Sequence, residues 1–171
     1  MIHASLSRRL HEDIYVAKNP PKDQNCDMDQ IQNKRLKDFM VKDVIFITTG
    51  DSMVTAYEKM QLRGVRHLPV LDKNNEVVGV FTQTDLNRAC PPRETDSGWH
   101  YSRSDMDQFL LGHFIHKEPV ILTTEDTLGK AASLMALNKY SCIPVVHPDT
   151  KKLAGIVTNI DILRQIGQSL S

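Results

Sequence analysis

The chain has 171 residues, of which 40% are hydrophobic and 25% are charged, and its 21 lysines and arginines balance 21 aspartates and glutamates. This is the composition of an average globular protein, and it excludes disordered and fibrous chains. A chain of this length buries enough surface to hold one or two cores without disulfides or metals. Because no segment is strongly basic, we expect no nucleic-acid partner.

Three cysteines, Cys26, Cys90 and Cys142, lie far apart and form no CxxC pattern. Their spacing indicates neither a disulfide framework nor a zinc site, and it suits a reducing compartment. Charged residues interrupt the N-terminal apolar stretch, and no window approaches the ~18 apolar residues of a membrane span. We therefore expect a cytoplasmic protein without a membrane partner.

The first half of the chain is predicted to form one mixed unit. Residues 1–28 are expected to be an N-terminal extension that ends in a proline-containing linker. Residues 29–89 form the first unit, which begins with a lead-in helix over 29–40. The remaining elements of this unit are predicted in the order strand, helix, strand, strand and helix, over 44–48, 51–63, 67–71, 77–82 and 83–89.

The second half of the chain is predicted to repeat this order. Residues 90–104 are expected to be an irregular connection, in which Trp99 serves as a packing anchor. Residues 105–171 form the second unit, which begins with a lead-in helix over 105–114 because apolar residues share a face there. Its remaining elements are predicted over 120–123, 126–138, 142–146, 153–158 and 159–168.

The two units are copies of one sequence pattern. The segment HLPV at 67–70 aligns with CIPV at 142–145. If one residue is inserted in the following hairpin of the second copy, the later positions of the two copies also align. A single loop insertion is what a duplicated fold tolerates. Identical pairs include Thr48 and Thr123, Asp51 and Asp126, Ala56 and Ala131, Pro69 and Pro144, Thr82 and Thr158, and Asp85 and Asp161.

Each copy contains a Thr-Thr-x-Asp turn, an amphipathic helix, an x-Pro-Val strand and a Gly-hydrophobic-x-Thr-x-x-Asp segment. This pattern resembles a tandem pair of cystathionine-β-synthase (CBS) domains, also called a Bateman module, over residues 36–168. The segment RHLPV at 66–70, followed by 79–85 and 89–92, is also similar to the stand-alone acetoin-utilisation (AcuB) type. The resemblance implies an α/β (α+β) fold with two pseudo-twofold-related β-α-β-β-α repeats packed sheet to sheet.

The resemblance also implies a function, that of a regulatory module rather than an enzyme. Such a module reversibly binds an adenosine ligand, for example AMP, ADP, ATP or S-adenosylmethionine, in symmetric clefts between the repeats, and it has no obligatory cofactor. A homodimer is implied too, together with a regulated partner protein that responds to a change in conformation or oligomeric state. The alternative is a ligand-free interaction or dimerisation module that acts as a scaffold.

The first candidates for the ligand site are Thr82 with Asp85 and Thr158 with Asp161. A Thr between a strand and a helix places its hydroxyl beside unpaired backbone N–H groups, which stabilise a phosphate. An Asp three residues later offers two acceptor oxygens to the hydroxyls of a ribose, the role that the resemblance assigns to it. The alternative is a capping box, in which the Thr caps the helix and the Asp accepts from the amide of the Thr. Both roles can hold at once, with the ligand competing for the same groups.

The resemblance places polar contacts to the nucleoside at Thr48 and Thr123, beside the first strand of each repeat. The alternative role of these threonines is to cap the helices that start near Asp51 and Asp126, and a cap typically stabilises by ~1 kcal/mol. Of the two roles, the residue pattern favours capping.

Arg66 and His67 precede Leu-Pro-Val, where nucleotide-binding members of the resembled family carry basic residues. The second copy has Ser-Cys at 141–142 instead, so the two clefts are chemically unequal. In the family fold the basic pair of one repeat faces the ribose aspartate of the other. We therefore expect Arg66 and His67 to join Thr158 and Asp161 in the stronger phosphate site. The alternative is a solvated charged turn.

Two apolar residues, Leu68 and Ile143, are further candidates, as walls of an adenine slot, although apolar residues beside a strand usually belong to the core. His113 and His116 have a His-x-x-His spacing without a third or fourth ligand, so we expect no metal site. The sequence contains no nucleophile elbow, P-loop or other catalytic motif, and we assign no catalytic residue.

Overall fold

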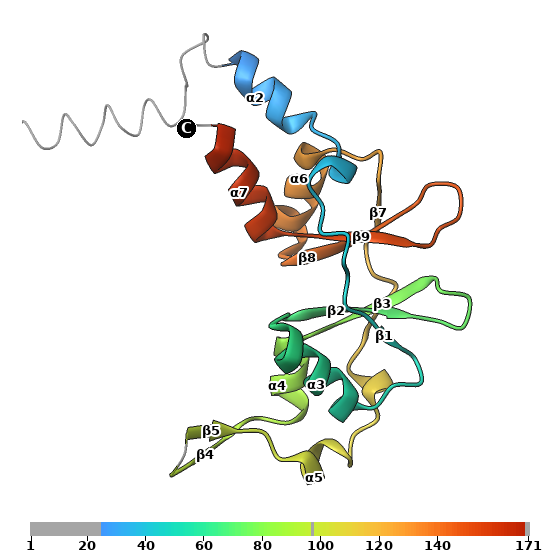
Figure 1. Cartoon of the computed structure of the whole chain (residues 1–171), viewed down its shortest axis with the longest axis vertical. Coiled ribbons are helices and arrows are strands. Elements are labelled where there is room, and N and C mark those ends of the chain that lie inside the picture. Colours follow the sequence, from blue (N-terminus) through green and yellow to red (C-terminus); the bar gives the residue numbers. More distant parts are fainter. Residues whose placement is uncertain (1–24, 97, 170–171) are drawn as a thin grey trace, which may run out of the picture.

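Two β-sheets face each other at the centre of the molecule (Figure 1). The computed structural model describes residues 25–96 and 98–169, so residues 1–24 of the expected N-terminal extension lie outside it. The strand order is β1-β2-β3-β6 in the first sheet and β7-β8-β9 in the second. The strands are β1 Ile47–Thr48, β2 His67–Leu71, β3 Val77–Thr82, β6 His116–Lys117, β7 Leu122–Thr123, β8 Cys142–Val146 and β9 Leu153–Thr158.

The pairing of the strands repeats between the two sheets. β1 is parallel to β2, and β2 is antiparallel to β3. β7, β8 and β9 pair in the same way, and the register shifts at equivalent places, between Val70 and Leu71 and between Val145 and Val146. β1 is shorter than the predicted strand over 44–48, because only its last two residues pair with β2. The duplication of the fold is therefore present in the hydrogen bonding itself.

Helices cover the outer faces of the two sheets (Figure 1). These are α3 (Met53–Arg63) and α4 (Gln83–Ala89) in the first repeat, and α6 (Leu128–Asn138) and α7 (Asn159–Ser169) in the second. α3 and α6 begin two residues later than predicted, because Ser52 and Thr127 accept the N-cap hydrogen bonds. The helices predicted over 51–63 and 126–138 are otherwise confirmed.

Contacts between the sheets join the two repeats. Val80 of β3, Cys142 of β8 and Ile156 of β9 form a small buried cluster, and Val44 packs against it. Each repeat also has a larger core of its own between its sheet and its helices. The predicted α/β fold with two repeats packed sheet to sheet is confirmed.

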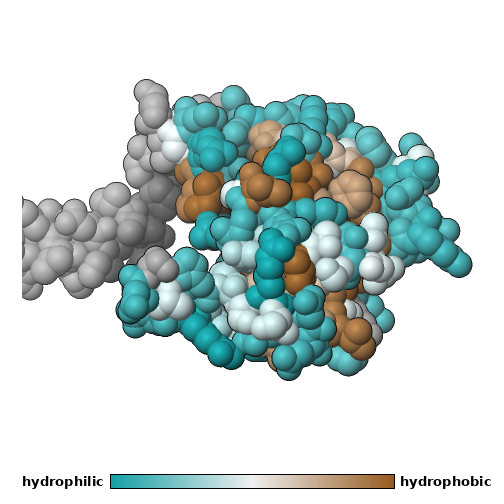
Figure 2. Space-filling view, turned by 60° about the horizontal axis from the view of Figure 1, so that its bottom comes forward, coloured by the Kyte–Doolittle hydropathy of each residue, from teal (hydrophilic) through white to brown (hydrophobic). Residues whose placement is uncertain are grey.

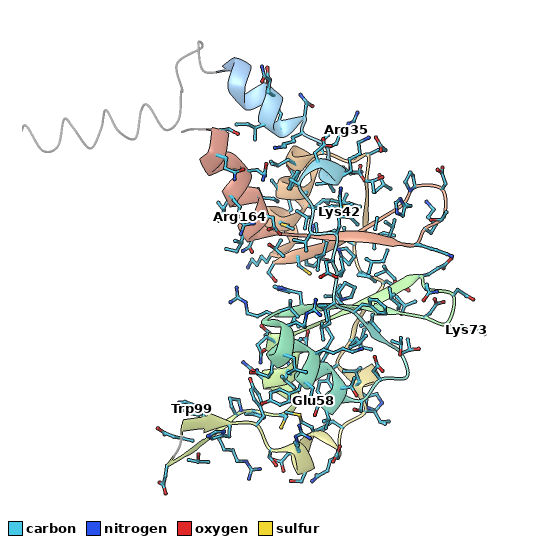
Figure 3. All side chains as sticks on the ribbon, in the orientation of Figure 1. Arg35, Lys42, Glu58, Lys73, Trp99 and Arg164 are labelled. Carbon is cyan, nitrogen blue, oxygen red and sulfur yellow. The ribbon has the colours of Figure 1, made fainter. Side chains whose placement is uncertain are left out.

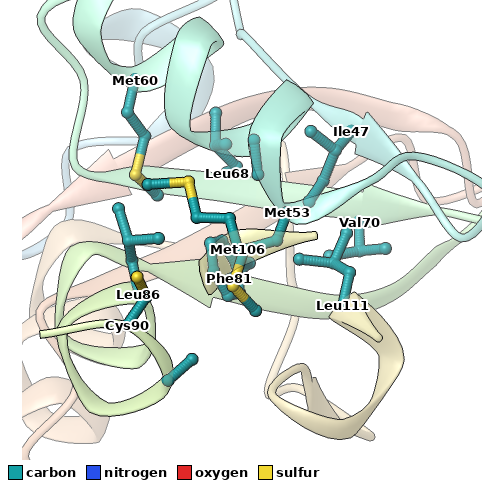
Figure 4. Packing of buried hydrophobic residues seen from close by; sticks show 12 residues of the cluster. Ile47, Met53, Met60, Leu68, Val70, Phe81, Leu86, Cys90, Met106 and Leu111 are labelled. Carbon is teal, nitrogen blue, oxygen red and sulfur yellow. The ribbon is translucent and has the colours of Figure 1, made fainter. Parts of the chain in front are cut away.

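The lead-in segments pack on the repeat opposite to the one that follows them. α2 (Asn25–Gln32) and the 3₁₀ helix η2 (Leu36–Asp38) precede the first repeat, yet Leu36 and Met40 are buried in the core of the second. Conversely, Met106 of α5 (Arg103–Met106) and Leu111 of η3 (Leu111–His113) complete the core of the first repeat (Figure 4). The boundaries 29–89 and 105–171 thus describe the repeats in sequence, whereas the cores exchange their lead-in segments.

Backbone hydrogen bonds hold the exchanged segment in place. Val41 and Ile156 donate their amides to each other's carbonyls at 3.0 Å, and Leu36 donates to Asp126 at 2.9 Å. Periodicity alone shows that a segment is amphipathic, not which of two similar cores it fills. The continuous helices predicted over 29–40 and 105–114 are wrong, because each segment forms two short helices separated by non-helical residues.

The connection between the repeats is more regular than predicted. β4 (Arg93–Thr95) and β5 (Gly98–His100) form an antiparallel hairpin whose described residues are all exposed. Trp99 keeps 67% of its surface exposed, so its predicted role as a packing anchor is wrong. It lies at the far end of the first repeat, away from the sheets (Figure 3).

The surface is mixed in character. On the face drawn in Figure 2, hydrophobic residues form several groups separated by hydrophilic ones. Within 25–96 and 98–169, none of the helices combines the length and the apolar character that crossing a bilayer requires.

The exchange of lead-in segments can be tested at Gly155. A Cβ atom at this position would lie 2.5 Å from the sulfur of Met40 and 2.9 Å from the carbonyl oxygen of Val41. The Gly155→Ala variant is therefore expected to lose about 1–3 kcal/mol of unfolding free energy, because a backbone atom has to move. Gly167→Ala in α7 is the control, since nothing lies within 4 Å of its Cβ position. Equal stability of the two variants in urea denaturation would contradict this packing.

Candidate functional site

Equivalent polar residues meet at the ends of the central strands. In the first sheet, His67 at the start of β2 is the ladder partner of Thr82 at the end of β3. In the second sheet, Cys142 and Thr158 are paired in the same way. The sheet-to-sheet contact brings these four positions to the boundary between the repeats.

The two Thr-x-x-Asp segments form capping boxes. In the first, Asp85 accepts from the amide and hydroxyl of Thr82 at 2.9 and 2.6 Å, and the Asp85 amide donates back to the hydroxyl at 3.3 Å. Thr158 and Asp161 have the same geometry, and Arg164 also donates to Asp161 at 2.9 Å. Asp85 is 1% exposed and Asp161 6%. The capping role is confirmed, and any ligand must share these carboxylates with it.

A cavity of about 380 Å³ lies between the repeats beside Thr82. His67 crosses this boundary, because its Nε2 is 2.7 Å from the hydroxyl oxygen of Ser141. The cavity is lined by His67, Val80 and Thr82 from the first repeat and by Glu118, Pro119, Val120, Asn138, Lys139, Tyr140, Ser141, Cys142 and Pro144 from the second.

The structure brings together only part of the predicted site. His67 and Thr82 line the cavity, whereas Arg66, Thr158 and Asp161 do not. Asp85 is joined to the cavity through its hydrogen bonds with Thr82. The expected grouping of His67 with Thr158 is therefore not the grouping found at this cavity. His67 is a ladder neighbour of Thr82, in its own repeat.

The two apolar candidates belong to the cores. Leu68 and Ile143 are buried in the cores of the first and second repeats and do not line the cavity. Side chains alternate along a strand, so when His67 faces the cavity its neighbour Leu68 faces the helices. The adenine slot at these residues stays a prediction that this cavity does not support.

The threonines beside the first strands stabilise turns. The helix-capping role favoured for them is wrong, because Ser52 and Thr127 are the N-caps of α3 and α6. Thr48 donates its amide to Asp51 at 2.9 Å, and Thr123 donates its amide and hydroxyl to Asp126 at 2.7 and 2.9 Å. Burial tends to raise the pKa of Asp51, but hydrogen bonds from the Thr48 amide and from Lys59 outweigh burial and lower it. Neither threonine lines the cavity.

Several wall residues had no motif that marked them in the sequence. Tyr140 follows the end of α6, and Pro119 and Val120 precede β7. In the internal alignment they correspond to Val65, Val44 and Ile45 of the first repeat, and that alignment was the signal that could have located them. Pro119 and Glu118 also line a second, more apolar cavity of about 590 Å³ on the other side of this segment.

Two side chains of the cavity wall, His67 and Cys142, have pKa values shifted towards their neutral forms. Burial lowers the pKa of His67, and the charge of Arg66 acts in the same direction, while Asp85 opposes both. Burial raises the pKa of the Cys142 thiol to about 12. A protonated thiol is a poor nucleophile and a poor metal ligand. Within the described part of the chain, no group of three or more His, Cys, Asp and Glu residues is placed to hold a metal ion.

Comparison with known proteins identifies the repeats. A sequence model described as "CBS domain" matches residues 36–91 and 111–168. An inosine-5'-monophosphate dehydrogenase of Korarchaeum cryptofilum is 27% identical over 143 residues, which cover 81% of this chain and 26% of that protein. An uncharacterised protein of Methanocaldococcus jannaschii is 25% identical over 139 residues, 78% of this chain and 47% of that protein. The chain therefore spans about half or less of the length of these relatives.

Solved structures share the fold. The CBS-pair protein CBSX2 of Arabidopsis thaliana, in complex with AMP, has a TM-score of 0.65 and 24% identity, and the match covers 81% of this chain and 99% of that one. A CBS domain pair in complex with 5'-methylthioadenosine and S-adenosylmethionine has a TM-score of 0.65 and 22% identity over 79% and 97% of the two chains. The acetoin-utilisation protein AcuB of Vibrio cholerae has a TM-score of 0.62 and 24% identity over 80% and 92%. The predicted resemblance to CBS pairs, including the AcuB type, is confirmed.

The shifted histidine predicts a dependence of stability on pH. Because the pKa of His67 in the folded protein lies below its ordinary value of 6.5, the unfolded chain binds this proton more readily. The stability that neutral His67 contributes to the folded protein is fully present above about pH 6.5. The unfolding free energy decreases as the pH falls below this value, because protons then bind preferentially to the unfolded chain. The unfolding free energy of His67→Gln is therefore expected to fall less between pH 7.5 and 5.5 than that of the wild type. His100→Gln, on the exposed hairpin, controls for the loss of a histidine as such, and identical profiles for all three proteins would refute the assignment.

Proposed function

Because the chain belongs to the CBS-domain family, we propose that it is a regulatory module that binds an adenosine-type ligand between its repeats. The binding is coupled to a partner protein through a change in the arrangement of the repeats. The role is one of sensing rather than catalysis, and it needs no obligatory cofactor. AMP, ADP, ATP and S-adenosylmethionine are the candidate ligands. Similar CBS pairs in complex with AMP, and with 5'-methylthioadenosine and S-adenosylmethionine, support this class.

The cavity beside Thr82 is the observation that carries the proposal. Its volume of about 380 Å³ falls within the range of roughly 300–1,000 Å³ that small-molecule sites occupy. Its walls combine apolar and aromatic side chains, among them Val80, Val120 and Tyr140, with an equal number of polar or charged ones. The polar and charged residues are His67, Thr82, Glu118, Asn138, Lys139 and Ser141. This combination suits a flat, apolar base with a few hydrogen-bonding groups.

Thr82 and Asp85 are proposed to hold the ribose. One oxygen of Asp85 accepts both hydrogen bonds of the capping box, and the other is 3.7 Å from Arg88. A carboxylate oxygen accepts more than one hydrogen bond, so ribose hydroxyls can be added to this arrangement. Because Asp85 is buried, the ligand must displace part of the wall beside His67 to reach it. By repeat equivalence, Thr158, Asp161 and Arg66 remain the proposed residues of a second cleft.

The coupling follows from the position of the cavity. Its walls come from both repeats, and the contact between His67 and Ser141 crosses from one to the other. A ligand that binds here favours the relative position of the repeats in which both walls contact it. Only such a difference in affinity between two arrangements can shift their populations.

The cellular setting is also part of the proposal. Cys90 and Cys142 are free and buried, which fits the reducing cytoplasm. We expect the protein to act there as a homodimer that contacts a regulated protein.

Ligand binding can be tested by filling the cavity. Titration calorimetry of the purified protein against AMP, ATP and S-adenosylmethionine is expected to give saturable binding below about 1 mM for at least one ligand. The Ser141→Phe variant places a ring at the cavity wall and is expected to weaken that binding at least about tenfold, which corresponds to ~1.4 kcal/mol. Ser133→Phe, on the exposed side of α6, is the matched control and should bind as the wild type does. If none of the three ligands binds, the sensing role is wrong, and recovery of a chemically altered ligand would indicate an enzyme instead.

The aspartates provide a second test. Asp85→Asn keeps an acceptor for the capping box but removes the charge that attracts the ribose hydroxyls, so it is expected to weaken binding in this cavity about tenfold or more. Asp161→Asn makes the same change in the other repeat, and we expect it to change affinity less than twofold. A greater loss with Asp161→Asn would instead place the principal site in the second cleft, with Arg66.

A scaffold without ligand is the second candidate function. Leu62 on α3 and Leu137 on α6 occupy equivalent positions and are 83% and 81% exposed. Apolar residues at equivalent exposed positions suit a symmetric protein interface. If the chain is a dimer in analytical ultracentrifugation, the Leu62→Lys and Leu137→Lys double variant is expected to sediment as a monomer. Ser133→Lys should leave the dimer intact. An unchanged dimer in the double variant would exclude this surface.

A further inference from the structure

The charged residues of the cavity beside Thr82 nearly cancel. Among its lining residues, Glu118 carries a negative charge and Lys139 a positive one, and no arginine takes part. His67 also lines the cavity, and burial and the charge of Arg66 lower its pKa, so it is mainly neutral at pH 7. The wall as a whole therefore offers little net positive charge to an anion.

Phosphate recognition requires more than this wall provides. A phosphate monoester carries about −1.5 to −2 charges at neutral pH, and sites for phosphate typically use arginine or several charge-assisted donors. Arg66 is the cation at the position equivalent to Ser141, and it does not line this cavity. A phosphate placed here would lie near the Glu118 carboxylate, with Lys139 as the one fully charged cation of the wall.

The two charged wall residues share an unusual backbone conformation. Glu118 and Lys139 have positive φ angles of 53° and 58°, a conformation that costs a residue other than glycine about 1–2 kcal/mol. The C-cap of α3 equivalent to Lys139 is Gly64, with φ 62°. Asn75 and Lys151 have similar φ angles in exposed hairpin turns, so the backbone conformation alone assigns no role. What distinguishes Lys139 is that it brings to the cavity wall a charge that Gly64 cannot supply in the first repeat.

We propose that this cavity selects adenosine ligands whose 5' substituent is neutral or cationic, such as a thioether or a sulfonium amino acid, over 5'-phosphorylated nucleotides. This inference rests on the proposed adenosine site. The apolar wall from Pro119 to Val120 accepts the base or the sulfur-bearing chain, and Glu118 attracts a cationic group. Lys139 balances a carboxylate on the same substituent.

The inference is tested by comparing ligands of different charge at one ionic strength, because salt screens such interactions. Calorimetry of the full chain with adenosine, AMP, ATP and S-adenosylmethionine is expected to show S-adenosylmethionine binding at least about tenfold tighter than ATP. Glu118→Lys should invert this preference: S-adenosylmethionine weakens about fivefold, AMP and ATP each gain about fivefold, and uncharged adenosine changes less than twofold.

A charge reversal elsewhere separates the local effect from net charge. Asp149→Lys lies in the exposed hairpin turn between β8 and β9, and it is expected to leave all four affinities within twofold of the wild type. If the wild type binds ATP more tightly than S-adenosylmethionine, or Glu118→Lys acts no differently from Asp149→Lys, the selectivity is wrong while the adenosine site stands. If no adenosine compound binds, both proposals are wrong.

Discussion

The contact between the two sheets is the constraint on which the rest of the molecule depends. In each repeat, helices cover one face of a short sheet, and the other face must be buried against something. Val80, Cys142 and Ile156 meet in that contact, and the exchanged lead-in segments extend it to the outer cores. The same contact places the first residues of β2 and β8 close to each other, where His67 contacts Ser141. The candidate site therefore exists only where both repeats are present and correctly placed.

Capping and ligand recognition use the same atoms. Thr82 and Asp85 secure the start of α4, and Thr158 and Asp161 secure that of α7, through matching hydrogen bonds. A helix start held in this way presents a fixed hydroxyl and carboxylate, which lowers the entropy that a ligand has to lose on binding. The structural role thus supports the proposed functional role, and the two are not competing explanations.

The two repeats have equivalent backbones, but the side chains at the start of β2 and β8 differ. Ser141 stands where the first repeat has Arg66, and Cys142 stands where it has His67. The backbone around these pairs is alike, including the ladder partners Thr82 and Thr158. The chemical difference between the clefts therefore arises from side chains at the start of the second strand of each repeat.

The sequence by itself determined the duplication, the order of strands and helices, and the capping threonines and aspartates, because these depend on local periodicity and on short hydrogen-bonding motifs. Comparison of the copies even marked His67 and Thr82. Only the tertiary structure decided that Leu36 fills the core of the second repeat and Leu111 that of the first. It also decided that Leu68 faces away from the cavity, and that Glu118 and Lys139 line it. Such choices depend on which surfaces meet when the two sheets pack, and residues distant in sequence carry no local signal of that meeting.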